Sequence, residues 1–143
     1  MARAVFNQVN LVVRDMAASL EFYRLVGLVI PESAVWKTAH GAHHATAKTE
    51  GVDLEFDSHA LARRYNAGFD AERANVVLGV RLESREAVDD AYERLISEGH
   101  QGLQVPYDAF WGARYAIVED PDGNPVGLMS PSDPARRTAP PQI

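Results

Sequence analysis

The chain has 143 residues, enough for one domain or two very small ones, and a chain of this length buries about 70% of its unfolded surface. Hydrophobic residues make up 46% of it, which is typical of a globular protein. The net charge of −6 and the pI near 5.3 argue against a nucleic-acid partner, because phosphate binding needs clustered lysine and arginine.

The sequence also limits the compartment. No run of 18 apolar residues is present, so we expect no membrane span. The first residues, MARAVFNQVNLVV, lack the apolar core and cleavage site of an export signal. There is no cysteine, which excludes disulfides and thiolate metal sites, and we expect a cytoplasmic protein.

The first half of the chain predicts a strand, a helix and three more strands. Residues 9–15, VNLVVRD, are rich in strand-forming side chains. Asp15 is a good N-cap for the following helix, in which Met16, Leu20 and Tyr23 form an apolar stripe at i, i+4 and i+7. Three shorter strand candidates come next, at residues 35–40, 42–48 and 52–56.

The second half repeats this order of elements. Residues 75–83, NVVLGVRLE, predict a strand, and Ser84 caps a helix with apolar residues on one face. Three strand candidates follow, at residues 102–105, 114–120 and 125–130.

The spacing of the two halves indicates a duplicated β-α-β-β-β unit. Equivalent positions are offset by 67 residues at the first strand, from Gln8 to Asn75, and by 72 at the last, from Glu55 to Gly127. One unit alone leaves an open sheet edge and an uncovered face. We therefore predict an α+β fold, in which two paired units form a curved mixed sheet of about eight strands with helices outside.

This prediction divides the chain into four parts: a first module at residues 1–57, a linker at 58–73, a second module at 74–131 and a C-terminal tail at 132–143. The linker is polar, with at most one short helix. The tail, SDPARRTAPPQI, has too much proline and too few apolar residues to pack, so it is expected to be loose.

Two stretches resemble the vicinal oxygen chelate superfamily, which includes glyoxalase I, extradiol dioxygenases, fosfomycin-resistance enzymes and bleomycin-resistance proteins. They are NQVNLVVRDMAASLEFYRLVGL at the first strand and helix, and ARYAIVEDPDGNPVGLMSP at the last hairpin. The resemblance implies paired β-α-β-β-β modules, usually assembled as a homodimer, with ligand clefts in the concavities of the sheet.

Metalloenzymes of this superfamily take their ligands from the first and last strands of each module. The matching positions here are Gln8, Glu55, Asn75 and Gly127. A divalent ion needs roughly three or more imidazole or carboxylate ligands. Glu55 is a good ligand, but two of the other positions offer only amides and Gly127 has no side chain. We therefore expect no metal ion and no other cofactor, as in the bleomycin-resistance-like branch.

The segment HGAHH supplies His40, His43 and His44. We interpret it as a hairpin at Gly41, with His43 and His44 on opposite faces, in preference to a metal site. One of the three can still face the pocket, and His44 enters the predicted ligand-binding set.

Large aromatic residues gather where the pocket is expected. Trp36 lies on the second predicted strand, and Phe110 and Trp111 precede the seventh. Two interpretations are open. These side chains fill the core or a dimer interface, or they form flat walls for a planar or cationic ligand that Arg114 or Glu55 orients.

Glu55 is the sole carboxylate expected in the concavity, and it has three candidate roles. We prefer a counter-charge for a cationic ligand, followed by a salt bridge to Arg114. As a general base it would be the catalytic residue of an enzyme. If Glu55 points inward, strand alternation directs Leu54 and Phe56 toward the helices.

Three functions are compatible with these features. The preferred one is a metal-independent protein of the antibiotic-resistance type that sequesters a small aromatic or cationic compound. The alternative is a lyase, isomerase or dioxygenase that uses a metal ion or Glu55, and the third is an inert dimer with a filled cavity. The predicted ligand-binding residues are Gln8, Trp36, His44, Glu55, Asn75, Phe110, Trp111 and Arg114.

Overall fold

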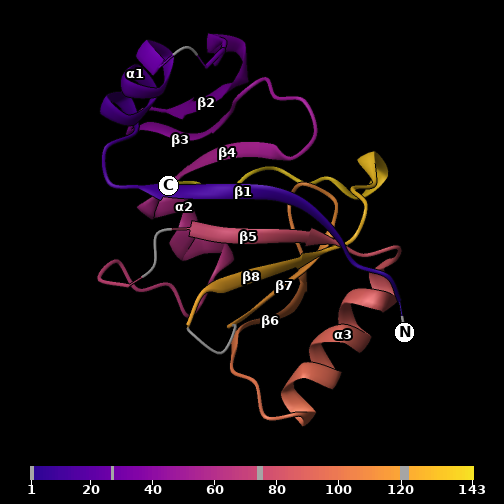
Figure 1. Cartoon of the computed structure of the whole chain (residues 1–143). Coiled ribbons are helices and arrows are strands. Elements are labelled where there is room, and N and C mark those ends of the chain that lie inside the picture. The colour runs from indigo at the N-terminus through magenta and orange to yellow at the C-terminus, as the bar shows by residue number, and fades with distance from the viewer. Residues whose placement is uncertain (1, 27, 74–75, 120–122) are drawn as a thin grey trace.

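One mixed sheet forms the framework of the protein (Figure 1). The computed structural model describes residues 2–26, 28–73, 76–119 and 123–143, and within them eight strands pair in the order β2-β3-β4-β1-β5-β8-β7-β6. The strands are β1 (Val5–Val13), β2 (Val35–Thr38), β3 (Gly41–Thr46), β4 (Asp53–Ser58), β5 (Val76–Arg81), β6 (Gly102–Asp108), β7 (Arg114–Glu119) and β8 (Pro125–Met129). The α-helices are α1 (Met16–Val26), α2 (His59–Tyr65) and α3 (Arg85–Ser97), and 3₁₀ turns lie at Glu32–Ala34 and Pro134–Arg136. None of the helices in these ranges is long and apolar enough to cross a bilayer.

The strand order places the two modules side by side. β1 and β5 pair antiparallel at the centre of the sheet, where Asn10 lies opposite Val77. The first strand of each module also pairs in parallel with the last strand of the same module, β1 with β4 and β5 with β8. The predicted α+β fold of two paired β-α-β-β-β modules is confirmed.

Helices α1 and α3 begin at the predicted caps and cover the outer face of the sheet. Asp15 Oδ1 accepts a hydrogen bond from the Ala18 amide at 3.0 Å, and Ser84 Oγ accepts one from the Ala87 amide at 3.1 Å. α1 packs on an apolar cluster that includes the fully buried Phe56, which faces the helix as predicted. The two helices lie at opposite ends of the molecule (Figure 1).

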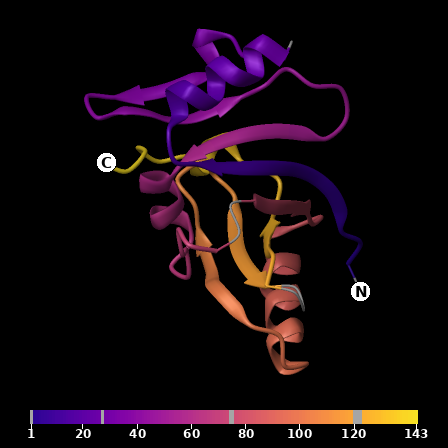
Figure 2. The same cartoon turned by 60° about the vertical axis from the view of Figure 1, so that its left-hand side comes forward.

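Helix α2 packs on the concave face instead, in the segment 58–73 that the sequence predicted to be a linker. Ser58 caps it by accepting a hydrogen bond from the Leu61 amide at 3.0 Å. Leu61, Ala62 and Tyr65 are buried in a cluster with residues of β1, β5 and β7. These three positions share one side of a short helix, so α2 belongs to the core and is more than a connection. Figure 2 shows it at the left of the view, at a height between α1 and α3.

The C-terminal tail, residues 132–143, is attached to the domain, in contrast to the loose tail that the sequence predicted. The Thr138 amide donates to the carbonyl of Phe110 at 3.0 Å, and Arg64 Nη2 donates to the carbonyl of Gln142 at 2.9 Å. A proline-rich segment lacks donors of its own but keeps its carbonyls, which side chains of the domain can reach.

Two strand boundaries differ from prediction in ways that shape the site. β1 begins at Val5 rather than residue 9, so Gln8 lies inside the paired strand. β4 continues to Ser58, which places Asp57 on the strand opposite His44. Both changes add polar side chains to the concave face.

Candidate functional site

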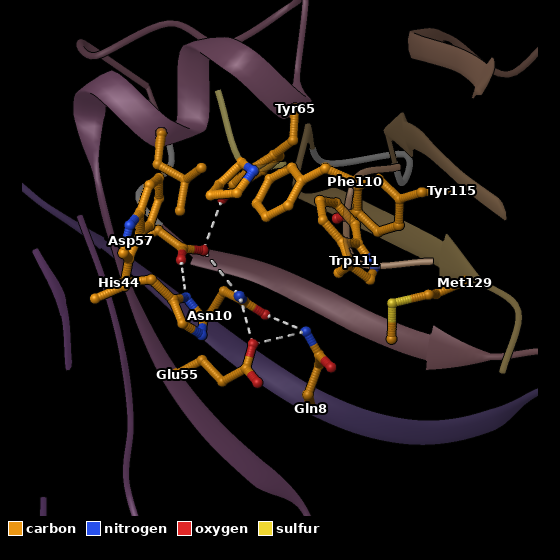
Figure 3. Close-up of a pocket in the computed structure, with 13 residues that line it drawn as sticks. Gln8, Asn10, His44, Glu55, Asp57, Tyr65, Phe110, Trp111, Tyr115 and Met129 are labelled. Carbon is orange, nitrogen blue, oxygen red and sulfur yellow. Dashed lines mark hydrogen bonds and ion pairs between the residues drawn. The ribbon is translucent and has the colours of Figure 1, made fainter. Parts of the chain in front are cut away.

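A cavity of about 350 Å³ lies on the concave face, and residues of both modules line it (Figure 3). One side carries amides, carboxylates and an imidazole, and the other carries aromatic and apolar side chains. The lining residues are Gln8, Asn10, Trp36, His44, Glu55, Asp57, Leu61, Tyr65, Phe110, Trp111, Tyr115, Met129 and Pro140.

Strand register builds the polar side of the cavity. Asn10 on β1 lies opposite Glu55 on β4, and His44 on β3 lies opposite Asp57. Side chains two residues apart on a strand point to the same face. Glu55 and Asp57 therefore both face the cavity, as do Gln8 and Asn10.

Asp57 is bonded on both of its carboxylate oxygens and is only 1% exposed. Oδ1 lies 2.7 Å from His44 Nδ1, while Oδ2 accepts hydrogen bonds from Asn10 Nδ2 at 2.8 Å and from the Tyr65 hydroxyl at 3.0 Å. Three donors compensate the loss of water around a buried carboxylate. Asp57 thus holds three neighbouring side chains in place.

Glu55 differs because the described residues bond only one of its oxygens. Oε2 accepts from Asn10 Nδ2 at 3.1 Å and from Gln8 Nε2 at 3.2 Å. No described residue makes a hydrogen bond to Oε1. Burial raises the pKa of Glu55, and the charge of His44 opposes that rise without cancelling it. Since Glu55 lines the cavity and its Oε1 has no partner among the described residues, this carboxylate can still accept a hydrogen bond or charge from a ligand.

His44 links the two carboxylates electrostatically. Burial alone would lower its pKa, but the hydrogen bond and charge of Asp57, together with the charge of Glu55, raise it overall. With Nδ1 bonded to Asp57, the Nε2 atom lies 3.3 Å from the Thr46 hydroxyl. A protonated His44 brings a positive charge to the polar side of the cavity.

The second side of the cavity is aromatic. The ring of Trp111 lies 5.2 Å from that of Phe110 and 5.2 Å from that of Tyr115, both edge-on, and Trp36 lies 6.3 Å from Phe110. Figure 3 shows Phe110, Trp111, Tyr115 and Met129 facing the polar cluster across the cavity. Such a surface favours a flat apolar ligand.

Gly127 on β8 leaves space that Tyr115 of the neighbouring strand occupies. A Cβ atom at this glycine would lie 2.6 Å from the Tyr115 hydroxyl and 3.1 Å from its ring. The last strand of the second module thus offers no ligand side chain, and an aromatic ring takes the space next to it.

The donor set does not fit a divalent ion. Gln8 and Asn10 both donate to the same oxygen of Glu55, so their amide groups compensate its charge as hydrogen-bond donors. Gly127 contributes nothing. Among the described residues, no group of three or more His, Cys, Asp or Glu side chains is arranged to hold an ion.

Six of the eight predicted ligand-binding residues line the cavity: Gln8, Trp36, His44, Glu55, Phe110 and Trp111. Asn75 lies outside the described residues. Arg114 does not line the cavity, because its guanidinium pairs with Asp89 at 2.8 Å and with Asp108 at 3.2 Å. The salt bridge to Glu55 that the sequence left open is therefore wrong.

The histidines of HGAHH lie in three different environments. His44 lines the cavity. His43 is buried between the hydroxyls of Thr38 at 2.8 Å and Ser58 at 3.0 Å, and burial lowers its pKa. His40 is exposed in the turn.

Several lining residues were not predicted, and only some of them had a signal in the sequence. Asn10 and Asp57 follow from Gln8 and Glu55 by the two-residue period of a strand. Tyr115 follows from the strand at 114–120, but its contact with Gly127 does not. The contributions of α2 and of Pro140 had no signal, because they depend on where a helix and the tail pack.

A sequence profile of the Glyoxalase/Bleomycin resistance protein/Dioxygenase superfamily matches residues 5–128. The chain belongs to this superfamily. The match spans both modules and confirms the resemblance seen in the sequence. No curated protein matches this superfamily member.

Solved structures share the fold of this superfamily member at low sequence identity. The NAD-dependent benzaldehyde dehydrogenase from Legionella pneumophila is 20% identical with a TM-score of 0.61, over 87% of this chain and 97% of that chain. The 2,3-dioxygenase LapB from Pseudomonas sp. KL28 is 14% identical with a TM-score of 0.60, over 90% and 42%. The Mn(II)-bound glyoxalase from Novosphingobium aromaticivorans is 18% identical with a TM-score of 0.56, over 91% and 40%. The chain thus spans less than half of the last two proteins, and the likeness shows the fold alone.

Proposed function

We propose that this protein binds a small aromatic compound in the cavity without a metal ion, and that Glu55 Oε1 receives a cationic or hydrogen-bond-donating group of that compound. The observation that carries the proposal is a half-buried carboxylate that lines a partly aromatic cavity and has one oxygen, Oε1, without a hydrogen bond from any described residue. The protein then acts by sequestration, as the resemblance to the bleomycin-resistance branch suggests.

The size of the cavity limits the ligand. A volume of about 350 Å³ lies near the lower end of the range of about 300 to 1,000 Å³ that is usual for small-molecule sites. One or two fused rings with a short polar arm fit this space. The presence of this volume also argues against the third hypothesis, an inert dimer whose cavity is filled by its own side chains.

Two features support binding without an ion. Gln8 and Asn10 turn their amide N–H groups toward Glu55 Oε2, so they act there as hydrogen-bond donors and not as oxygen ligands for an ion. The position at Gly127 lacks a ligand, and the Tyr115 ring occupies the adjacent space. The polar side is thus better suited to an organic donor group than to an ion.

The test is calorimetric titration at neutral pH with a matched pair of probes, 2-naphthylmethylamine and 2-naphthylmethanol. The amine is a cation and the alcohol is neutral, and both have the same ring system. We expect Glu55→Gln to weaken binding of the amine by about tenfold, or about 1.4 kcal/mol, and binding of the alcohol by much less.

Glu50→Gln is the matched control, because it removes a carboxylate from an exposed turn outside the cavity. It should leave both affinities unchanged. Equal losses for the amine and the alcohol in Glu55→Gln would refute the counter-charge role. Failure of the unmodified protein to bind any of a panel of one-ring and two-ring amines would refute the function.

The raised pKa of Glu55 favours a second candidate, a metal-independent isomerase in which Glu55 is the general base. In this role the carboxylate removes a proton next to a carbonyl group, and the resulting carboxylic acid returns it at a different carbon. Exchange of the α-protons of 2-tetralone in D₂O, followed by NMR, tests this activity. If the α-protons exchange no faster with the unmodified protein than with Glu55→Gln, the isomerase activity is excluded.

A further inference from the structure

The last six residues run from the loop before β7 to α2 and β2, and Pro140 among them lines the cavity. We name residues 138–143 the C-terminal strap. At its start the Thr138 amide bonds to the carbonyl of Phe110, in the loop before β7, at 3.0 Å. In both views the strap runs back to the region of α2 (Figures 1 and 2).

One side chain of the linker helix α2 and one of the first module hold the far end of the strap. Arg64 of α2 donates from Nη2 to the carbonyl of Gln142 at 2.9 Å. Thr38 of β2 donates its hydroxyl to the carbonyl of Ile143 at 3.0 Å. The Ile143 side chain packs against the same apolar cluster as the aromatic side of the cavity.

Between these attachments the strap is a wall of the cavity. Pro140 lines the cavity directly and is also exposed to solvent. Pro140 and Pro141 have no amide hydrogen, so the middle of the strap cannot donate backbone hydrogen bonds. Consecutive prolines also hold an extended and stiff backbone.

A stiff segment with few hydrogen bonds detaches as a unit, and its detachment requires less free energy than opening of the sheet. The attachment at Thr138 is to the loop before β7 of the second module, whereas those at the far end come from the linker helix α2 and from β2, an edge strand of the first module. Release of the far end would uncover Trp36 and Trp111, which line the cavity beneath.

We propose that the C-terminal strap gates the cavity, closing over it when Arg64 and Thr38 hold its far end and opening about Thr138 to admit a ligand. The identity of the admitted ligand rests on the proposed function, but the opening itself does not.

The two tryptophans make the gate measurable without a ligand. They are the only tryptophans in the chain, and both line the cavity. Acrylamide, a neutral quencher, reports their accessibility through the Stern–Volmer constant of the intrinsic fluorescence. We expect a chain that ends at Arg137 to show a constant about twofold higher or more than the full chain.

Arg64→Ala keeps the full chain and should also raise the constant, by a smaller factor. Arg63→Ala is the matched control, because Arg63 is the neighbouring exposed arginine of α2 and its guanidinium lies over the ring of Phe69, which is not part of the strap. It should leave the constant unchanged.

An unchanged constant in the shortened chain, with circular dichroism showing a native fold, would overturn the gate. If the shortened chain does not fold, Arg64→Ala decides alone, and equal constants for it and Arg63→Ala would overturn the gate. Titration of the full chain with 2-naphthylmethylamine tests the proposed function separately. A negative result in the quenching experiment therefore does not affect the interpretation of the titration, and the reverse also holds.

Discussion

Two carboxylates on β4 have different roles because their hydrogen-bond partners differ. Asp57 is bonded on both oxygens by three donors, so it organises the polar side of the cavity. Glu55 keeps Oε1 unbonded among the described residues, so it remains available to a ligand. Residue type and face alone do not separate these roles, since both are acidic residues that point the same way.

The ion pair between His44 and Asp57 makes stability depend on pH. The pKa of His44 is raised above its ordinary value of 6.5, so protonation of His44 stabilises the folded state below that pH. This stabilisation is lost as the pH rises through the raised pKa. The raised pKa of Glu55 acts in the same direction, but from its ordinary value of 4.5 upward.

We therefore expect the contribution of His44 to the free energy of unfolding, taken as the difference between the unmodified protein and His44→Gln in urea denaturation, to fall as the pH rises above about 6.5. His44→Gln should flatten this part of the profile. His100→Gln, an exposed histidine after α3, is the control and should keep the slope. A His44→Gln profile as steep as that of the unmodified protein would contradict the assignment.

At the scale of elements, the pairing of β7 with β8 decides what the second module contributes to the cavity. Tyr115 on β7 lies beside Gly127 on β8, and its ring uses the space that a side chain would need. The equivalent place in the first module carries Glu55. The glycine and the tyrosine are therefore one structural unit, which turns the second half of the cavity from polar to aromatic.

Gly127→Ala should test this unit, because its Cβ would lie 2.6 Å from the Tyr115 hydroxyl. We expect a loss of about 1–3 kcal/mol in the free energy of unfolding from forced movement of the ring. Part of that loss should be recovered in a Tyr115→Phe background, where the hydroxyl is gone. Additive effects of the two substitutions in chemical denaturation would show that the contact is unimportant.

Across the whole molecule, the two modules contribute unequal halves to one cavity. The first module supplies the amides, carboxylates and His44, and the second supplies most of the aromatic surface. Helix α2 and the C-terminal strap complete the enclosure. The homodimer that the resemblance implies stays a prediction, which sedimentation equilibrium can test.

The cavity as a whole should be independent of metal ions. An ion bound at about 100 times its dissociation constant would stabilise the fold by about 2.7 kcal/mol, so its removal would lower the melting temperature clearly. We expect a chelator to leave the melting temperature and the binding of 2-naphthylmethylamine unchanged.

Metal analysis of protein purified without chelator provides the control for that experiment. We expect substoichiometric manganese, nickel, zinc and iron. One tightly bound equivalent that disappears in Glu55→Gln would contradict the proposed site and favour a metalloenzyme.

Local sequence patterns predicted the elements well. The caps at Asp15 and Ser84 and the strand runs follow from short-range preferences, and the duplicated spacing led to the paired modules. The same patterns assigned Arg114 to the pocket, but its guanidinium pairs with Asp89 instead. Strand alternation cannot predict such an ion pair, because it carries no information on contacts with another element.

The chain's order of residues was sufficient for the duplicated fold and for the placement of Glu55 on an inward-facing strand position, because these depend on hydrophobic period and spacing along the backbone. The superfamily followed from the resemblance of two stretches to known members and was confirmed by the family profile. Packing alone decided that Asp57 is saturated while Glu55 is not, that Tyr115 fills the space beside Gly127, and that α2 and the C-terminal strap enclose the cavity. These features arise from contacts between segments far apart in the chain, whose distances and partners no local pattern encodes.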